Sequence, residues 1–377
     1  MPPRPLLASR ALGRIGQLPV GRVTWRQSGS GHLWWQGRGW RSAAVAAAAI
    51  ALAVALGVTL LAGSPGSGRA LTAPGASAQK VPVFPAFSLA PARGALFGAV
   101  VQTTGYSGPD AQRKAVAAFE RAIGRRLAID SLYVPWTGPM PSTTARWDLA
   151  RGTIPMITWA MARASRIAAG ADDRTIRAEA LQLKALRAPV LLRWFAEMNL
   201  ARNVAYAVSP ATFVAAWRRI HAIFARAGAT NVRWIWCPND SGFSQGTAQA
   251  YYPGSAYVNW ICADGFNWAP EIAGASWASF WQIFSSFYRW GRSTGKPMLI
   301  GEFGTLEGTP GAKAAWFAQA DRTLRRQFPA IRAVVYFESD HLDFGRYFDW
   351  SVTSSRSALT AFRAFAHDPY FSARPPT

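Results

Sequence analysis

Two glutamates each end a short apolar run, and their placement is the clearest sign of chemistry in the sequence. Glu197 lies near the end of residues 189–199 (PVLLRWFAEMN), and Glu302 lies near the end of residues 296–304 (KPMLIGEFG). Burying an unpaired charge costs on the order of several kcal/mol, so a lone glutamate at the end of a buried strand points to a function. If both strands belong to one barrel, the two carboxylates converge at one mouth. Paired carboxylates of this kind hydrolyse glycosidic bonds.

The elements that would position these glutamates begin at Gly94, where short apolar runs start to alternate with amphipathic stretches. The runs predict strands over residues 95–101, 128–134, 154–159, 190–195, 232–236, 261–266, 297–301 and 333–337. Helices are expected over residues 209–228, 277–295, 311–327 and 354–366. This order predicts an α/β fold, a (β/α)₈ TIM barrel over residues 93–371. A doubly wound open sheet is the alternative, but no glycine-rich phosphate turn follows the first strand.

Two polar residues flank the first glutamate. Positions 193, 195 and 197 share one face of an extended strand, so Arg193 is expected to point into the barrel and keep Glu302 ionised. A salt bridge that serves only the barrel is the alternative role for Arg193. Asn199 is expected either to contact a sugar hydroxyl or to cap a loop.

Aromatic and amide side chains follow other strands at the same end of the barrel. Trp136 and Trp159 come at the ends of the second and third strands, and Asn267 and Trp268 follow the sixth. Indole faces suit the C–H faces of sugar rings, so these four residues are candidates for substrate binding. Core packing is the alternative for each tryptophan.

Several motifs occur in the order found in one enzyme family. They are residues 193–199 (RWFAEMN), 228–239 (GATNVRWIWCPN), 264–268 (DGFNW), 300–304 (IGEFG) and 349–352 (DWSV). The chain thereby resembles glycoside hydrolase family 26, the β-mannanases and related endo-β-glycanases, over about residues 94–371. The resemblance implies a retaining endo-β-glycosidase acting on β-mannan or β-glucan, with Glu197 as acid/base and Glu302 as nucleophile. It implies no cofactor and no metal.

Three positions depart from that family's pattern. The residue before the acid/base is Ala196 where the family has His, and Leu200 replaces a Gly. Phe266 stands where the family has a Tyr that contacts the nucleophile. The alternative function is therefore a catalytically weak carbohydrate-binding barrel in cell-envelope or exopolysaccharide assembly.

The N-terminal region predicts a membrane anchor. Residues 1–42 carry seven Arg and no acid, and residues 43–62 carry no charge over a length that spans a bilayer core of about 30 Å. Residues 1–42 would be a basic cytoplasmic tail, and residues 63–92, rich in Pro, Gly and Ala, a linker to a barrel outside the cell membrane. The alternative is a signal peptide cleaved after residues 76–78 (ASA), which would leave a secreted protein.

Charge and composition bear on the remaining partners. The formal net charge is +22, but residues 1–93 hold ten Lys and Arg and no acid, and no basic run stands out in the barrel. We therefore expect no nucleic-acid binding. We also expect a monomer. The four His are scattered, with no pair at metal-ligand spacing. Cys237 ends one strand and Cys262 begins the next, which predicts opposite ends of the barrel and buried free thiols rather than a disulfide.

Overall fold

The computed structural model describes residues 26–27, 33–34, 88–343 and 346–373. Strands β1 (Arg26–Gln27) and β2 (Leu33–Trp34) pair antiparallel within a unit that ends at Gly68. The expected anchor over residues 43–62 lies outside the described residues. Within the described part of the chain, no helix has the length and apolar character needed to cross a membrane.

The expected barrel is confirmed. Eight parallel strands close into a ring in the order β10-β3-β4-β5-β6-β7-β8-β9. They are β3 (Leu96–Val101), β4 (Ile129–Val134), β5 (Ile154–Trp159), β6 (Val190–Trp194), β7 (Val232–Trp236), β8 (Trp260–Asn267), β9 (Met298–Thr305) and β10 (Ile331–Glu338). A hairpin of β11 (Asp340–Asp343) and β12 (Arg346–Asp349) follows the last barrel strand.

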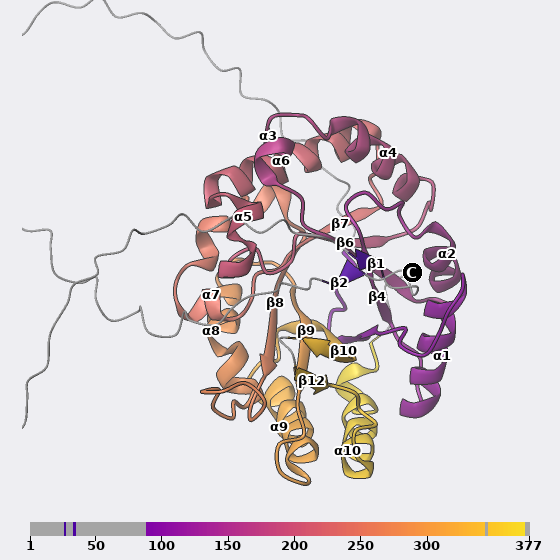
Figure 1. Cartoon of the computed structure of the whole chain (residues 1–377), viewed down its shortest axis with the longest axis vertical. Coiled ribbons are helices and arrows are strands. Elements are labelled where there is room, and N and C mark those ends of the chain that lie inside the picture. The colour runs from indigo at the N-terminus through magenta and orange to yellow at the C-terminus, as the bar shows by residue number, and fades with distance from the viewer. Residues whose placement is uncertain (1–25, 28–32, 35–87, 344–345, 374–377) are drawn as a thin grey trace, which may run out of the picture. The chain divides into compact units, whose positions relative to one another are not determined.

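Helices surround the strands, as Figure 1 shows. They are α1 (Ala111–Ile123), α2 (Ser142–Ala150), α3 (Ala164–Ala168), α4 (Asp173–Lys184), α5 (Val204–Ala207), α6 (Pro210–Ala227), α7 (Ser241–Ser244), α8 (Phe280–Arg292), α9 (Ala312–Arg326) and α10 (Arg356–Ala366). Helix α6 begins and ends as its sequence predicts. Ser209 caps its first turn by accepting from the Thr212 amide, and Gly228 ends it in the left-handed conformation at φ 73°.

Alternation along the strands sorts the buried side chains into two cores. One core fills the barrel and includes Ile129, Met156 and Leu191. The other lies between strands and helices and includes Ile157, Trp159 and most buried helical side chains. Leu89, from the expected linker, is buried with the first core.

A one-residue bulge interrupts β9 just before Glu302. Ala263 pairs with Ile300 and the next residue, Asp264, pairs with Glu302, so Gly301 has no partner on β8. The pairing of β9 with β10 shows the same extra residue. Without the bulge, the side chain of Glu302 would point outward from the barrel, as that of Ile300 does. The extra residue turns its side chain into the barrel, where bulges commonly re-aim functional groups.

Candidate active site

Glu302 lies on β9 with its side chain almost fully buried, and two donors meet its carboxylate. Arg193 on β6 forms an ion pair with Oε1, and the Tyr133 hydroxyl on β4 donates to the same oxygen. Arg193 is fully buried and Glu302 is 6% exposed. The two donors stabilise negative charge on this carboxylate at the mouth of the barrel.

The guanidinium of Arg193 is fixed from three sides. Its Nη1 donates to both carboxylate oxygens of Asp264, at 2.8 and 2.9 Å, and its Nε donates to Thr158 Oγ1 at 3.0 Å. Burial alone would lower the pKa of Arg193, but Asp264 and Glu302 raise it instead. The expected inward orientation of Arg193 is therefore observed. It is paired with a second buried acid that the sequence did not single out.

Glu197 reaches the same mouth by a different route from the one expected. Strand β6 ends at Trp194, and Phe195 and Glu197 adopt positive φ angles of 51° and 55°. The expectation that residues 193, 195 and 197 share one face is wrong, because Phe195 packs outward against Trp194 and Phe213. Non-glycine residues in this region cost on the order of 1–2 kcal/mol each, and such strain clusters at functional sites.

Both oxygens of Glu197 are occupied. Asn239 Nδ2 donates to Oε1 at 2.8 Å, and Arg202 forms an ion pair with Oε2. Burial raises the pKa of Glu197, the charge of Arg202 lowers it, and the charge of Glu302 raises it again, with a net upward shift. The two glutamates therefore have different surroundings. Glu197 is poised to hold a proton, whereas Glu302 is paired with a fixed cation.

Asn199 acts as a brace in this network. Its Oδ1 accepts from the Asn239 amide at 2.8 Å, and its Nδ2 donates to the Asn239 carbonyl at 3.4 Å. These bonds fix the position of Asn239, which in turn donates a hydrogen bond to Glu197. Of the two expected roles for Asn199, loop capping is the one its contacts match.

Two of the candidate substrate-binding residues lie away from the mouth. Trp159 is fully buried in the outer core, where it stacks on Trp136 at 4.1 Å between ring centres. Asn267 is also fully buried, and it donates to Thr305 and accepts from the Ala278 amide. The structure thus places Trp159 and Asn267 in packing and loop support, because a strand end carries both inward and outward side chains.

The other two candidates keep part of their surface exposed. Trp136 is half-buried and stacks on Trp159, while Trp268 is half-buried and meets Phe348 and Trp350 edge-on. Their exposed edges remain candidate platforms for sugar rings.

Tyr133 is the functional residue that sequence reasoning missed. Phe266, which occupies the position of the expected tyrosine, packs against Trp268, Phe337 and Trp350. The phenol that contacts Glu302 comes instead from β4. The alternation of side chains along β4 was the available signal. Tyr133 lies on the same face of the strand as Ile129, which fills the barrel.

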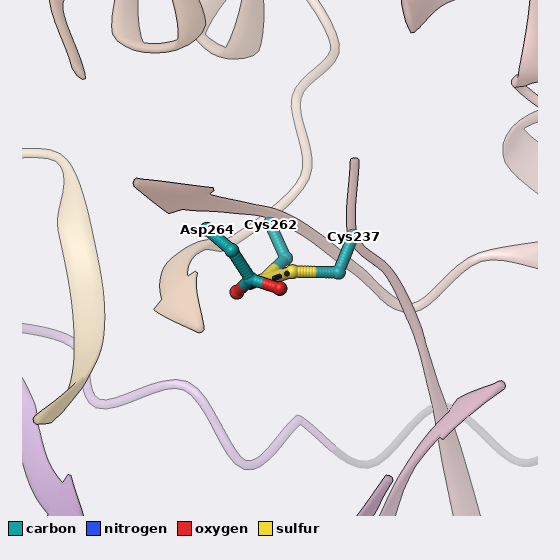
Figure 2. A group of neighbouring side chains, drawn as sticks. All are labelled: Cys237, Cys262 and Asp264. Atoms are coloured by element: carbon teal, nitrogen blue, oxygen red, sulfur yellow. Dashed lines mark hydrogen bonds between the residues drawn. A yellow bond between two sulfur atoms is a disulfide. The ribbon is translucent and has the colours of Figure 1, made fainter. Parts of the chain in front are cut away.

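Cys237 and Cys262 form a disulfide inside the barrel (Figure 2), so the expectation of free thiols is wrong. The two Cα atoms are 4.3 Å apart. The stagger between neighbouring strands explains the error. Because Trp236 pairs with Ile261, the residue that ends β7 lies beside the residue near the start of β8.

The disulfide borders the charged cluster. Cys237 Sγ lies 3.2 Å from Asp264 Oδ1, and Figure 2 shows the carboxylate beside both sulfurs. Among the described residues, these three side chains form the one group with donor atoms close enough for a metal ion. The disulfide removes both sulfurs as thiolate ligands, so this group is not a metal site in the oxidised protein.

The fold and the site together define a (β/α)₈ barrel with two glutamates in different surroundings at one mouth. Known proteins share the fold. No family model matches the chain. Endoglucanase H of Acetivibrio thermocellus is 31% identical over 268 residues, which are 68% of this chain and 29% of that protein. The chain thus spans less than a third of that relative's length.

Solved structures agree on the fold. The catalytic domain of a family 26 endo-β-1,4-mannanase from Bacillus sp. JAMB-750 matches with a TM-score of 0.58 at 16% identity, covering 75% of this chain and 88% of that one. A β-mannanase from a symbiotic protist of the termite Reticulitermes speratus, in complex with a gluco-manno-oligosaccharide, matches with a TM-score of 0.53 at 14% identity, covering 74% and 88%. The resemblance to family 26 is confirmed at the level of the fold.

Proposed function

We propose that this chain is a family 26 glycoside hydrolase, a retaining endo-β-glycosidase that acts on a β-mannan or β-glucan type of polysaccharide. The observation that carries this proposal is the different environment of the two glutamates. Glu302 is paired with Arg193 and Tyr133, and Glu197 lies in a desolvated position that raises its pKa. One carboxylate suited to attack and one suited to donate a proton make up the double-displacement machinery.

In the first step, Glu302 attacks the anomeric carbon and Glu197 protonates the departing glycosidic oxygen. Arg193 and Tyr133 both contact Oε1 of Glu302, so Oε2 is the oxygen that we expect to attack. In the second step, Glu197 removes a proton from water, and that water releases the sugar from Glu302. Sugar rings would bind along the exposed edges of Trp136 and Trp268.

We also propose that the barrel works outside the cytoplasm, either tethered through residues 43–62 or secreted. The Cys237–Cys262 disulfide supports this location, because disulfides persist in oxidising compartments.

The test compares Glu302→Ala and Glu197→Ala with the wild type on a panel of soluble β-glycans and activated aryl β-glycosides. We expect Glu302→Ala to lose turnover on every substrate. Glu197→Ala should lose turnover on polysaccharide far more than on aryl glycosides, because good leaving groups need little protonation. Added azide should rescue only Glu197→Ala with retained anomeric configuration, giving a β-glycosyl azide, whereas any product that azide forms in Glu302→Ala would have the inverted α configuration.

The opposite outcome is equally specific. If the wild type hydrolyses no β-glycan and both variants bind oligosaccharides as tightly as it does, the enzyme assignment fails. The alternative, a carbohydrate-binding barrel in polysaccharide assembly, would then hold.

A further inference from the structure

Two protein donors contact the proposed acid/base in the free protein. A general acid must present an O–H group to the glycosidic oxygen. In this structure Asn239 donates to Oε1 of Glu197 and Arg202 donates to Oε2. Both oxygens therefore accept from protein donors. Loss of the Arg202 contact would free Oε2 to face the glycosidic oxygen and would remove a cation that opposes protonation of Glu197.

Asn239 is the less movable of the two partners. Its backbone amide and carbonyl are held by Asn199, and its side-chain oxygen accepts from the amide and hydroxyl of Ser241. Releasing Glu197 would break several of these bonds together. Asn239 is therefore a fixed support for Oε1.

Arg202 is built to move without its backbone. It lies in a short 3₁₀ turn, η1 (Ala201–Asn203), and the next residue, Asn203, is buried and donates to the Glu197 carbonyl at 2.9 Å. The turn is thus pinned, while the side chain of Arg202 is 43% exposed. Rotation of that side chain alone would free Oε2 of Glu197.

The position of Arg202 indicates what would draw it away. The acid/base faces the departing part of the substrate, so a guanidinium on its carboxylate lies beside the sugar that leaves. Guanidinium groups prefer planar, bidentate anions, above all carboxylates. The chain from residue 94 onward also holds 31 Lys and Arg against 19 Asp and Glu, so its net charge does not oppose an anionic substrate.

We propose that Arg202 selects substrates with a carboxylate on the leaving-group side, and that capture of this carboxylate uncovers the acid/base. The substrate class is then an acidic β-glycan, one that carries uronic acid units. This inference rests on the function proposed above and names the substrate of that same site.

Capture of the substrate carboxylate by Arg202 would also change the pKa of Glu197. Arg202 lowers the pKa of Glu197, and removing its charge leaves burial and the charge of Glu302 to raise it, with Arg193 as the opposing cation. Asp240 also faces Glu197, and burial together with the Glu197 charge raises the pKa of Asp240 to about 7. Glu197 therefore gains proton affinity when the substrate arrives, which is when a proton is needed.

The test pairs two substrates with two variants. The substrates are a soluble neutral β-glycan that the enzyme cleaves and the same glycan partly oxidised to carboxylates at C6. The variants are Arg202→Gln and Arg325→Gln. Arg325 is a matched control on α9, because it is 38% exposed and is also paired with a carboxylate, that of Asp321.

We expect the wild type and Arg325→Gln to prefer the carboxylated glycan at least tenfold in kcat/KM. Arg202→Gln should lose this preference and cleave the carboxylated glycan no faster than the neutral one. The basic limb of its pH profile on the neutral glycan should move upward, because Glu197 then keeps its proton to higher pH.

Other results would overturn the inference. The wild type could cleave both glycans equally, or Arg202→Gln could lose kcat/KM equally on both. Either result would show that Arg202 does not distinguish carboxylated from neutral glycans, while the proposed hydrolase function would stand. If no variant cleaves any glycan or aryl glycoside, the proposed function fails, and this inference fails with it.

Discussion

The carboxylate of Glu302 depends on a phenol from an unexpected strand. Tyr133 donates to Glu302 from β4, while the position expected to supply a tyrosine holds Phe266 in an aromatic cluster. Residues of β4 and β6 together thus contact the Glu302 carboxylate. The departure at Phe266 is therefore compatible with an active enzyme.

Removing this phenol should slow catalysis without unfolding the protein. We expect Tyr133→Phe to lower kcat/KM by about ten- to hundredfold, since a donor on a reacting carboxylate is lost. Steady-state kinetics on an aryl glycoside would measure this. Tyr347→Phe is the control, because Tyr347 also donates to a carboxylate, that of Asp340, from an exposed position. Equal rates for Tyr133→Phe and wild type would rule out the role.

The alternation of side chains between the two faces of a strand explains which site residues can be recognised in the sequence. Glu197 and Glu302 stand out because each ends an apolar run. Trp159 and Tyr133 do not, since a strand end looks alike on both faces until the register is known. Met156 fills the barrel, so Thr158 points inward to Arg193 and Trp159 points outward into the outer core.

At the scale of elements, the bulge in β9 is the device that aims Glu302. Gly301 occupies the extra position, directly against the disulfide. A Cβ there would lie 2.3 Å from Cys262 Sγ and 2.6 Å from Asp264 Oδ1. Neither neighbour is the free end of a flexible chain, so only glycine fits.

Gly301→Ala should therefore destabilise the barrel by about 3 kcal/mol, because overpacking a fixed interior forces strands apart. Urea unfolding followed by circular dichroism would measure the loss. Gly295→Ala is the control. Gly295 has a positive φ of 68° but no atom within 4 Å of an added Cβ, so backbone strain of about 1 kcal/mol is expected. Similar losses in both variants would contradict the packing argument.

A second pair of elements, β4 and α2, buries two carboxyl groups together. Asp130 and Asp148 are both fully buried. Burial raises the pKa of Asp130 to about 7, and burial followed by the neighbouring Asp130 charge raises that of Asp148 to about 9. The folded protein thus binds these protons more tightly than the unfolded chain. Their contribution to stability is full near pH 4 and is lost as the pH rises through 7 and 9.

Asp148→Asn should remove much of this dependence, because the amide mimics the protonated acid. We expect the variant to be more stable than wild type at pH 9 and similar at pH 4, measured as the free energy of unfolding in urea. Asp173→Asn should change the free energy of unfolding in the opposite direction. Its hydrogen bond to Arg219 lowers the pKa of Asp173, so that substitution costs stability above pH 4. A wild-type dependence of stability on pH retained in Asp148→Asn would show that the buried Asp148 carboxyl does not cause it.

Element order was predictable from the sequence, and strand stagger was not. All eight barrel strands were predicted from their apolar runs, and the helix predicted over residues 209–228 matches α6 with its two caps. The bulge at Gly301 and the pairing of Cys237 with Cys262 depend on how far one strand slides along its neighbour. That offset is a property of the closed barrel and leaves no mark in any single strand.

At the scale of the whole molecule, the basic and apolar N-terminal region should decide where the barrel works. If residues 43–62 span the membrane, the intact chain should stay with membranes after a carbonate wash. External protease should then release a fragment that begins within residues 63–92. A soluble mature protein that begins near Gln79 would instead establish a cleaved signal peptide and a secreted enzyme.

The disulfide near Glu302 has a consequence for when the barrel is completed, if the chain is exported. While the chain is in the reducing cytoplasm, Cys237 and Cys262 would remain thiols at the floor of the active site, beside Asp264 and against Gly301. The bond that sets this floor would close only after export. The barrel would therefore reach the geometry described here only outside the cytoplasm.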